Sequence, residues 1–329
     1  MSKFNSEIKK IGVFCSGGDA PGMNAAIRSV VRSSIYHGLE VTGIVSGYQG
    51  ILDEKFQPMQ LRAVANIIQR GGTILKTARC ADFHKKEIRA KAVDHLKKEK
   101  IDGLICIGGD GSFTGAHYLW TEHQFPVIGV PGTIDNDING TDYTIGFDTA
   151  VNTALDAIDR IRDTAASHDR LFIVEVMGRN SGFIAASVGL AGGAEEIFTP
   201  DINVTVEKAV EKIKSGVQKG KMSSIIVAAE GQKPGRAYDL AEQIRKRTGL
   251  EAKVCILGHV QRGGSPTAAD RILASRMGAF AVDSLLQKNC DSMTAINGEK
   301  LSLVEFDTAV NIERKLSKDL LNLAQILSL

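Results

Sequence analysis

Short apolar runs rich in β-branched residues recur along the chain and are separated by longer amphipathic segments. Runs of four to six such residues, bounded by turn residues, are typical of buried parallel strands. They cover residues 11–15, 41–45, 103–107, 127–130, 171–176, 224–229 and 254–257. Helical spacing is found between them, in residues 23–31, 88–98, 149–164, 206–219 and 236–248.

The alternation of predicted strands and helices indicates an α/β fold with mainly parallel sheets and right-handed crossovers. A chain of 329 residues that is 43% hydrophobic can form two cores of about 150 residues each. No low-complexity tract separates two halves, so we expect the chain to cross between the domains more than once. Ligands in such folds bind beyond the carboxyl ends of the strands, so the loops after the strands are the candidate sites.

Composition narrows the possible functions. Forty Lys and Arg against 38 Asp and Glu give a formal charge of +2, which does not favour a nucleic acid or a membrane surface as a partner. The five cysteines form no C-x-x-C pair, and three lie in apolar runs. This pattern predicts thiols that stay reduced and pack among apolar residues, and not disulfides or a zinc site. The absence of an apolar signal core near the first residue and of any 18-residue apolar stretch predicts a cytoplasmic protein.

Two strands run directly into glycine-rich turns that precede helices. The first turn is Ser16-Gly-Gly-Asp-Ala-Pro-Gly22, and the second is Gly108-Gly-Asp-Gly-Ser112. Glycines let backbone N–H groups turn toward an anion, and a helix N-terminus adds partial positive charge. In the second turn Asp110 supplies the hard oxygen that Mg²⁺ takes beside phosphates. The alternatives are a simple tight turn and an Asx turn, but two such loops favour a nucleotide phosphate site.

A third strand ends in Pro131-Gly-Thr-Ile-Asp135-Asn-Asp137. If this segment is extended, Asp135 and Asp137 point the same way, and their repulsion raises the proton affinity of one of them. One carboxylate can then act as a general base for a hydroxyl. The alternative is a solvated acidic turn.

These three loops resemble those of the bacterial ATP-dependent phosphofructokinases. The resemblance extends over about residues 10–280 and includes further matches: Arg70-Gly-Gly-Thr73, Asp163-Thr164, Ser167-His168, Val176-Met-Gly-Arg179 and Gly258-His-Val-Gln-Arg-Gly-Gly-Ser-Pro266. It implies two Rossmann-like three-layer α/β/α domains. The expected ATP-Mg domain comprises residues 1–146 and 263–310, and the expected fructose 6-phosphate domain comprises residues 147–262 and 311–329.

The implied reaction transfers the γ-phosphoryl of ATP to the 1-hydroxyl of fructose 6-phosphate, the committed step of glycolysis. By this resemblance, Asp135 takes the proton of the 1-hydroxyl and Asp110 holds Mg²⁺. The amide of Gly18 contacts the transferring group, and Arg79 neutralises charge that develops on the γ-phosphoryl oxygens. Its catalytic set also includes Thr133 and Arg179. The implied ATP contacts are Gly18, Arg79, Cys80, Gly109, Asp110, Gly111 and Ser112. The implied sugar-phosphate contacts are Thr133, Asp135, Asp137, Met177, Gly178, Arg179, Glu230, His259 and Arg262.

Two more cations are expected to reach the 6-phosphate from a neighbouring subunit of a homotetramer. Arg170 matches one of them, and Lys253 stands where the family commonly has arginine. Lysine keeps the charge but loses the bidentate fork.

The expected phosphoryl donor depends on two glycines, Gly111 and Gly132. Relatives that use pyrophosphate usually carry aspartate and lysine at these positions. An aspartate at position 111 would repel the α-phosphate of a nucleotide, so glycine favours ATP.

Arg28 and Arg32 lie one helical turn apart and form either a solvated basic stripe or part of an effector site. The resemblance implies the effector site, for ADP or phosphoenolpyruvate, with Arg162, Glu195, Lys219 and Lys221. The family's polar and acidic positions before Arg70 are occupied here by Leu61, Arg62, Ala65 and Asn66, which leaves the effector and its sign open. The functional alternatives are a pyrophosphate-dependent phosphofructokinase, a non-catalytic sugar-phosphate-binding regulator and, more remotely, a Rossmann dehydrogenase.

Overall fold

The structure is a computed structural model that describes residues 2–166, 171–200, 205–218 and 224–328. Three predicted site residues, Arg170, Lys219 and Lys221, lie outside this part of the chain, as do Ser167 and His168. The chain forms two compact units. The first comprises Met1–Ile134, Ile138–Asp148 and Arg262–Arg314, and the second comprises Asp135–Asp137, Thr149–Gln261 and Lys315–Leu329.

The first unit is built on a seven-stranded sheet in the order β13-β12-β6-β5-β2-β3-β4. The strands are β2 (Lys10–Cys15), β3 (Glu40–Ile44), β4 (Phe56–Pro58), β5 (Gly103–Gly108), β6 (Val127–Pro131), β12 (Ser292–Asn297) and β13 (Lys300–Glu305). The five central strands are parallel, and β4 and β13 pair antiparallel at the two edges. Every residue of β5 is buried, as expected for a strand covered on both faces.

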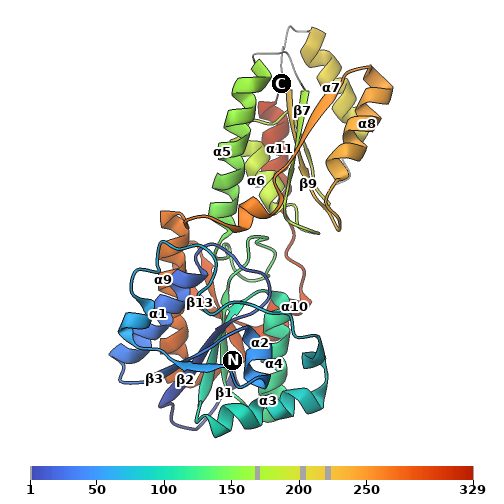
Figure 1. The fold of residues 1–329 in the computed structure, drawn as a ribbon. Helices are drawn as coiled ribbons and strands as arrows, with labels where there is room; N and C mark the ends of the chain where they lie inside the picture. The colour runs from blue at the N-terminus through green and yellow to red at the C-terminus, as the bar shows by residue number, and fades with distance from the viewer. Residues whose placement is uncertain (1, 167–170, 201–204, 219–223, 329) are drawn as a thin grey trace. The chain divides into compact units, whose positions relative to one another are not determined.

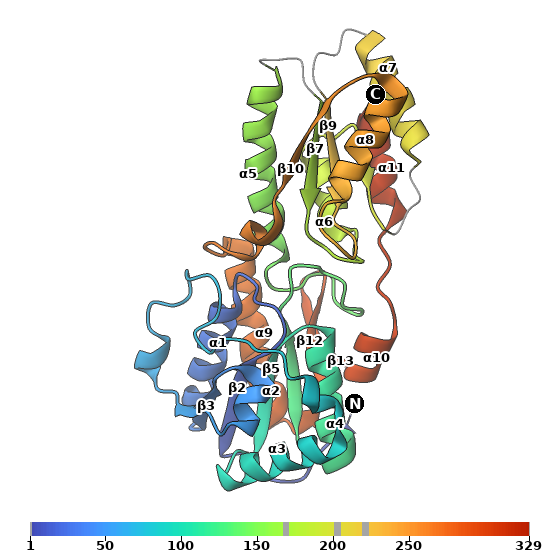
Figure 2. The same ribbon diagram turned by 45° about the vertical axis from the view of Figure 1, so that its right-hand side comes forward.

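Helices cover both faces of this sheet, which makes the unit a three-layer sandwich (Figure 1). On one face α1 (Met23–Tyr36) packs along α9 (Ala268–Leu286). The other face carries α2 (Gly47–Leu52), α3 (Lys86–Lys98), α4 (Asp110–His123) and α10 (Phe306–Asn311), as Figure 2 also shows. The core beneath α3 and α4 includes Phe14, Phe113 and Phe306. Short segments complete the unit: β1 (Ser2–Lys3), β11 (Asn289–Cys290), η1 (Leu61–Val64) and η2 (Ala81–His84).

The second unit is built on a four-stranded parallel sheet in the order β10-β7-β9-β8. Its strands are β7 (Leu171–Val176), β8 (Glu196–Phe198), β9 (Ser224–Ala229) and β10 (Ala252–Ile256). One face carries α5 (Phe147–Ala166), α6 (Phe183–Ala191) and α11 (Lys318–Leu327), and the other carries α7 (Val206–Gln218) and α8 (Arg236–Thr248) (Figure 1). The η3 turn (Gly258–Arg262) follows β10.

The α/β class with mainly parallel sheets is confirmed, and the seven predicted strands correspond to β2, β3, β5, β6, β7, β9 and β10. The five predicted helices correspond to α1, α3, α5, α7 and α8. Within the part of the chain that the structure describes, no helix is both long and apolar enough to cross a membrane.

Candidate functional site

Two glycine-rich turns lie at the same edge of the sheet in the first unit. The parallel register pairs Cys15 with Ile107 and Gly108 with Pro131, so β2, β5 and β6 end together. Main-chain hydrogen bonds continue between the strands at this edge: Ser16 N, in the first turn, donates to Ile107 O of β5 at 3.0 Å, and Gly132 N, in the loop after β6, donates to Gly108 O at 2.9 Å. The helices α1 and α4 both begin at this edge, so two helix N-termini and two glycine turns provide backbone N–H groups together.

The approach of the two turns requires glycine at position 108. A Cβ atom there would lie 2.6 Å from Ser16 O and 2.5 Å from the Oγ atom of the buried Ser112. Neither the main-chain oxygen nor the buried hydroxyl can move away without loss of packing. The turn sequence is therefore fixed partly by the contact between the two loops.

Arg262 lies against the first turn. Its Nη1 atom donates a hydrogen bond of 2.9 Å to Asp19 O, and a Cβ atom added to Gly18 would be 2.6 Å from the same Nη1. Both residues belong to the first unit. The structure thus brings a cation to the turn in which Gly18 was predicted to contact the transferring phosphoryl group.

The second turn is open at the positions predicted to face the nucleotide and the metal. Asp110 is the first residue of α4 and is exposed. A Cβ atom added to Gly111 meets no atom within 4 Å, so the chain's own packing does not require glycine there. A Cβ atom at Gly109 would contact the Cβ of Thr133 at 3.8 Å, which brings Thr133 to the same turn.

A buried tyrosine, Tyr48, connects the second turn to η2. Its hydroxyl donates to Ser112 O at 2.5 Å, and its ring stacks on Phe83 with 4.1 Å between centroids. The exposed Arg79 precedes η2, and Cys80 is its N-cap, where burial raises the pKa of the thiol. Sequence reasoning missed Tyr48, although an aromatic residue just after a strand at the ligand edge was a possible signal.

Asn24, in the first turn of α1, holds the loop before Arg79. Its Nδ2 atom donates to Arg70 O at 3.0 Å and to Gly71 O at 3.2 Å, and its Oδ1 accepts from Ile74 N at 2.8 Å. The side chain is almost fully buried. This residue was also missed, because an asparagine on a helix is usually exposed and the sequence does not show which loop it contacts.

The segment containing Asp135 is bent, so the condition under which Asp135 and Asp137 would point the same way is not met. Asn136 has φ of 51°, in the left-handed region, and residues 134 and 135 form a bend. Alternation of side chains along a strand therefore does not apply to Asp135 and Asp137. Asp135 is buried and Asp137 is partly exposed. Asparagine can adopt the left-handed conformation because its short polar side chain can form local hydrogen bonds.

The Met177-Gly-Arg179 element forms a tight turn after β7. Gly178 has φ of 138° and Arg179 has φ of 48°. The Arg179 N–H donates to Glu230 Oε1 at 3.4 Å, which brings the ends of β7 and β9 together as their register requires. Gln261, fully buried, accepts from Met177 N at 2.8 Å through Oε1 and donates to Ala150 O at 3.3 Å. Gln261 was missed, although it stands between His259 and Arg262.

One further predicted contact, Lys253, lies near the start of the edge strand β10, and another, His259, lies after its end. Lys253, on the edge strand β10, pairs with Glu251 at 3.0 Å. His259 is exposed within η3.

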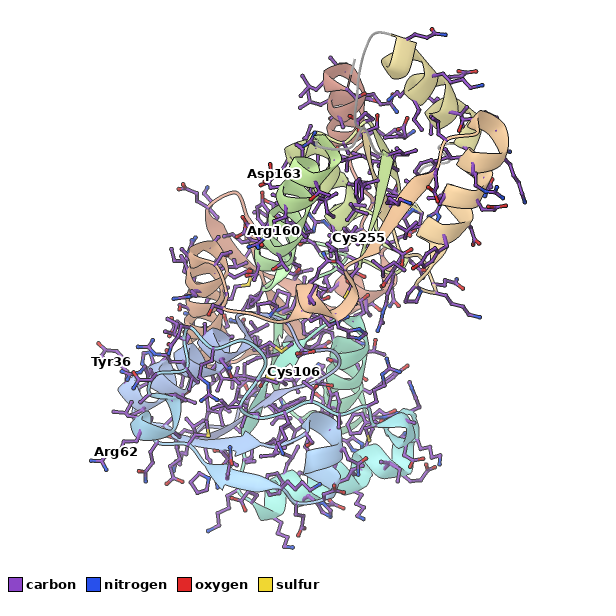
Figure 3. The ribbon with its side chains drawn as sticks, turned by 45° about the horizontal axis from the view of Figure 1, so that its top comes forward. Tyr36, Arg62, Cys106, Arg160, Asp163 and Cys255 are labelled. Carbon is purple, nitrogen blue, oxygen red and sulfur yellow. The ribbon has the colours of Figure 1, made fainter. Side chains whose placement is uncertain are left out.

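The predicted effector residues fall on separate parts of the fold. Arg28 and Arg32 lie on α1, which packs against η1, where Leu61 and Arg62 stand. Arg62 and Tyr36, the last residue of α1, project outward (Figure 3). Ala65 caps η1, and Asn66 has φ of 54°.

In the second unit, Arg162 donates to Gly192 O and to Gly193 O at the end of α6. The nearby Glu195 is buried, and its carboxylate accepts a hydrogen bond from Ile225 N. Arg162 and Glu195 are thus brought to the same turn by main-chain contacts.

Comparison with known proteins identifies the family. Residues 10–285 match the family described as phosphofructokinase. An ATP-dependent 6-phosphofructokinase from Halothermothrix orenii is 53% identical over 98% of this chain and 100% of its own length. A relative named ATP-dependent 6-phosphofructokinase 1, from Thermus thermophilus, is 56% identical with the same coverage.

Solved structures agree with this assignment. The phosphofructokinase from Saccharomyces cerevisiae has a TM-score of 0.85 and 35% identity, over 92% of this chain and 45% of that longer chain. A pyrophosphate-dependent phosphofructokinase from Marinobacter aquaeolei has a TM-score of 0.84 and 25% identity, over 97% and 91%. The chain belongs to the phosphofructokinase family.

Proposed function

We propose that this chain is an ATP-dependent 6-phosphofructokinase, which transfers the γ-phosphoryl of ATP to the 1-hydroxyl of fructose 6-phosphate and releases ADP. The observation that carries the proposal is the close approach of the two glycine turns at the ends of β2 and β5. Relatives of 53% and 56% identity that align over their full length have this activity in their names. The reaction is the committed step of glycolysis.

The first unit binds the nucleotide in this account. Gly18, Gly109, Gly111 and Ser112 line the phosphates, and Arg79 neutralises charge that develops on the γ-phosphoryl oxygens. Cys80 is a further contact of ATP. Phosphoryl transfer depends mainly on positioning and electrostatic stabilisation. Backbone N–H groups at two helix N-termini, with Arg262 beside them, supply that stabilisation without reorganisation during the reaction.

Asp110 is the residue that would hold Mg²⁺. Among the residues that the structure describes, no group of three or more His, Cys, Asp and Glu is arranged as a metal site. A single exposed carboxylate nevertheless fits Mg²⁺, which keeps several waters and binds through one or two carboxylates plus substrate phosphates. When bound, the ion neutralises charge on the phosphate oxygens.

Asp135 accepts the proton of the sugar 1-hydroxyl, and Thr133 and Arg179 complete the catalytic set. The proposed substrate contacts from the second unit are Asp135, Asp137, Met177, Gly178, Arg179, Glu230 and His259. The turn of Met177, Gly178 and Arg179 is held by Glu230 and Gln261, which supports a fixed binding surface. Arg262 is a further sugar-phosphate contact, and Arg170 and Lys253 join it from a neighbouring subunit.

Gly111 supports ATP as the donor. Nothing in the chain lies within 4 Å of a Cβ atom at this position, so the open space has no role in internal packing. At Gly132, in contrast, a Cβ atom would already lie 3.1 Å from Ile107 and from Met23. The absence of aspartate and lysine at these two positions leaves room for a nucleotide rather than pyrophosphate alone.

Assembly and regulation complete the proposal. A homotetramer with a contribution from Arg170 across subunits accounts for the catalytic site, and ADP or phosphoenolpyruvate is the proposed effector. The proposed effector residues are Arg28, Arg32, Arg162, Glu195, Lys219 and Lys221. Light scattering combined with activity measurement tests the shared site, because an active monomer would contradict it.

The regiochemistry of the product tests the proposed reaction. The purified chain is incubated with ATP, Mg²⁺ and fructose 6-phosphate, and the product is identified by ³¹P NMR. We expect one new phosphate monoester, on the 1-hydroxyl. A phosphate on another hydroxyl, or hydrolysis of ATP without sugar phosphorylation, would overturn the proposal.

A further inference from the structure

Ser181 lies where the turn after β7 meets the segment of the proposed general base. Its Oγ atom donates a hydrogen bond of 2.8 Å to the main-chain oxygen of Asp135. Its N–H donates to Gly178 O at 2.7 Å. Both partners belong to the second unit together with Ser181. One residue, with its side chain on one partner and its main chain on the other, thus connects the proposed base to the proposed sugar-phosphate turn.

The hydroxyl of Ser181 both donates and accepts a hydrogen bond. Besides donating to Asp135, Oγ accepts from the N–H of Phe183, the first residue of α6, at 3.4 Å. A serine that only capped the helix would need to accept. The donated bond to Asp135 is additional, and it is directed at a residue that is itself buried. Ser181 is 6% exposed, so water does not readily replace the bond.

The geometry of the turn makes this contact important. Arg179 has a left-handed φ of 48°, a conformation that persists when surrounding contacts fix it. Gln261 fixes one side through Met177 N, and Ser181 fixes the other through Gly178 O. A Cβ atom on Gly178 would lie 2.6 Å from Ser181 O, so the two residues are already in close contact. A shift of Ser181 would therefore be passed to both the turn and Asp135.

We infer that Ser181 is a positioning residue that sets the main chain of Asp135 against the turn of Met177, Gly178 and Arg179. The inference rests on the proposed function, because it assigns Asp135 to the sugar hydroxyl. Ser181 acts through Asp135 and does not touch the reacting atoms. A misplacement of about 1 Å can reduce the rate about 100-fold, so loss of this bond reduces turnover rather than nucleotide binding.

The test compares Ser181→Ala with Ser181→Thr in the full-length chain. Steady-state kinetics give kcat and the KM for each substrate, and thermal unfolding gives Tm. We expect Ser181→Ala to lower kcat about 10- to 100-fold, with an unchanged KM for ATP and little change in Tm. Ser181→Thr keeps the hydroxyl and restores most of the turnover.

Two further variants serve as controls. Ser34→Ala removes another buried hydroxyl, which donates to Val30 O within α1, and it should leave kcat unchanged. If Ser181→Ala does not fold, Ser181→Cys keeps the side-chain size with a weaker donor, and its lowered kcat then carries the test. A kcat close to wild type in the folded Ala or Cys variant would overturn the inference, as would a loss that threonine does not rescue. A wild-type chain that does not phosphorylate fructose 6-phosphate overturns the proposed function and this inference together.

Discussion

The guanidinium of Arg262 donates a hydrogen bond of 2.9 Å to the main-chain oxygen of Asp19 and touches the space beside Gly18. An arginine from the segment after β10 is therefore fixed on the first glycine turn. From the sequence it was assigned to the sugar phosphate alone. The observed contact adds a role in holding the turn that presents amides to the phosphates.

Replacement of Arg262 by lysine should lower kcat/KM about tenfold or more, because a hydrogen bond from a charged group contributes about 1.5–3 kcal/mol and lysine lacks the planar fork. Arg276→Lys is the matched control. Arg276, on α9, also donates to a main-chain oxygen, that of Glu299, but its bond is exposed and does not involve a glycine turn. Equal losses in the two variants would show that Arg262 has no specific role.

Asp135→Ser should lower kcat by about two to four orders of magnitude, the usual effect of removing a positioned general base. The affinity for ATP should change little, because Asp135 lies outside the unit that carries the glycine turns. Initial rates with saturating ATP and a separate nucleotide binding titration measure the two effects. Turnover near that of the wild type would remove Asp135 from its proposed role.

Gly111→Asp should fold normally and bind ATP poorly. A Cβ atom at this position meets no neighbour. A carboxylate, in contrast, repels a phosphate by about 1 kcal/mol in water and by about 4 kcal/mol in a partly buried setting. The KM for ATP should therefore rise by roughly 5- to 1000-fold while Tm stays the same. Gly111→Asn is the neutral control of the same size. If the asparagine variant binds ATP as poorly as the aspartate variant, the effect is steric and the electrostatic argument is wrong.

The buried pair of Arg89 and Glu122 should stabilise the first unit. Arg89 donates to both carboxylate oxygens, at 2.7 Å and 2.5 Å, and also to the main-chain oxygens of Phe83 and His84 in η2. Arg89→Ala leaves a partly buried carboxylate unpaired and should destabilise the protein by more than an exposed pair does, up to the roughly 3–5 kcal/mol of a fully buried pair. The single tryptophan, Trp120, lies two residues from Glu122 on the same helix and reports unfolding of this region in urea.

The same pair predicts a dependence of stability on pH. The hydrogen bond from Arg89 lowers the pKa of Glu122 below its usual value of 4.5. The stabilisation is fully present above pH 4.5 and is lost as the pH falls through the folded-state pKa. Arg89→Ala should abolish this acid-dependent part. Arg160, which is labelled in Figure 3, forms an exposed pair with Asp156. Arg160→Ala should change stability by less than about 1 kcal/mol; a loss as large as that of Arg89→Ala would contradict the account.

The regular elements could be predicted because hydrophobic periodicity reports burial. Fully buried strands such as β5 and β9 appear as uninterrupted apolar runs. The strands β12 and β13, which pair antiparallel with each other, were not predicted. The strand β12 includes Ser292 and Thr294, which are buried but polar, and β13 is partly exposed. Polar residues inside the sheet disturb the pattern on which such predictions depend.

The glycine-rich turns that follow the strands were predictable, as at Gly18, Gly109 and Gly178. Contacts of a residue with a distant loop were not predictable. Asn24 bonds to a segment about 50 residues away, Tyr48 to Ser112 and Gln261 to Met177. The bend at Asp135 has a local cause, since the left-handed conformation of Asn136 is not implied by its neighbours.

A direct comparison of two phosphoryl donors tests whether Gly111 and the two adjacent turns form a site for ATP. Formation of fructose 1,6-bisphosphate is followed by a coupled assay with saturating fructose 6-phosphate and Mg²⁺, with ATP or pyrophosphate as the donor in parallel. The account predicts that kcat/KM is larger with ATP and that pyrophosphate gives little or no product. Product formed only with pyrophosphate would contradict it.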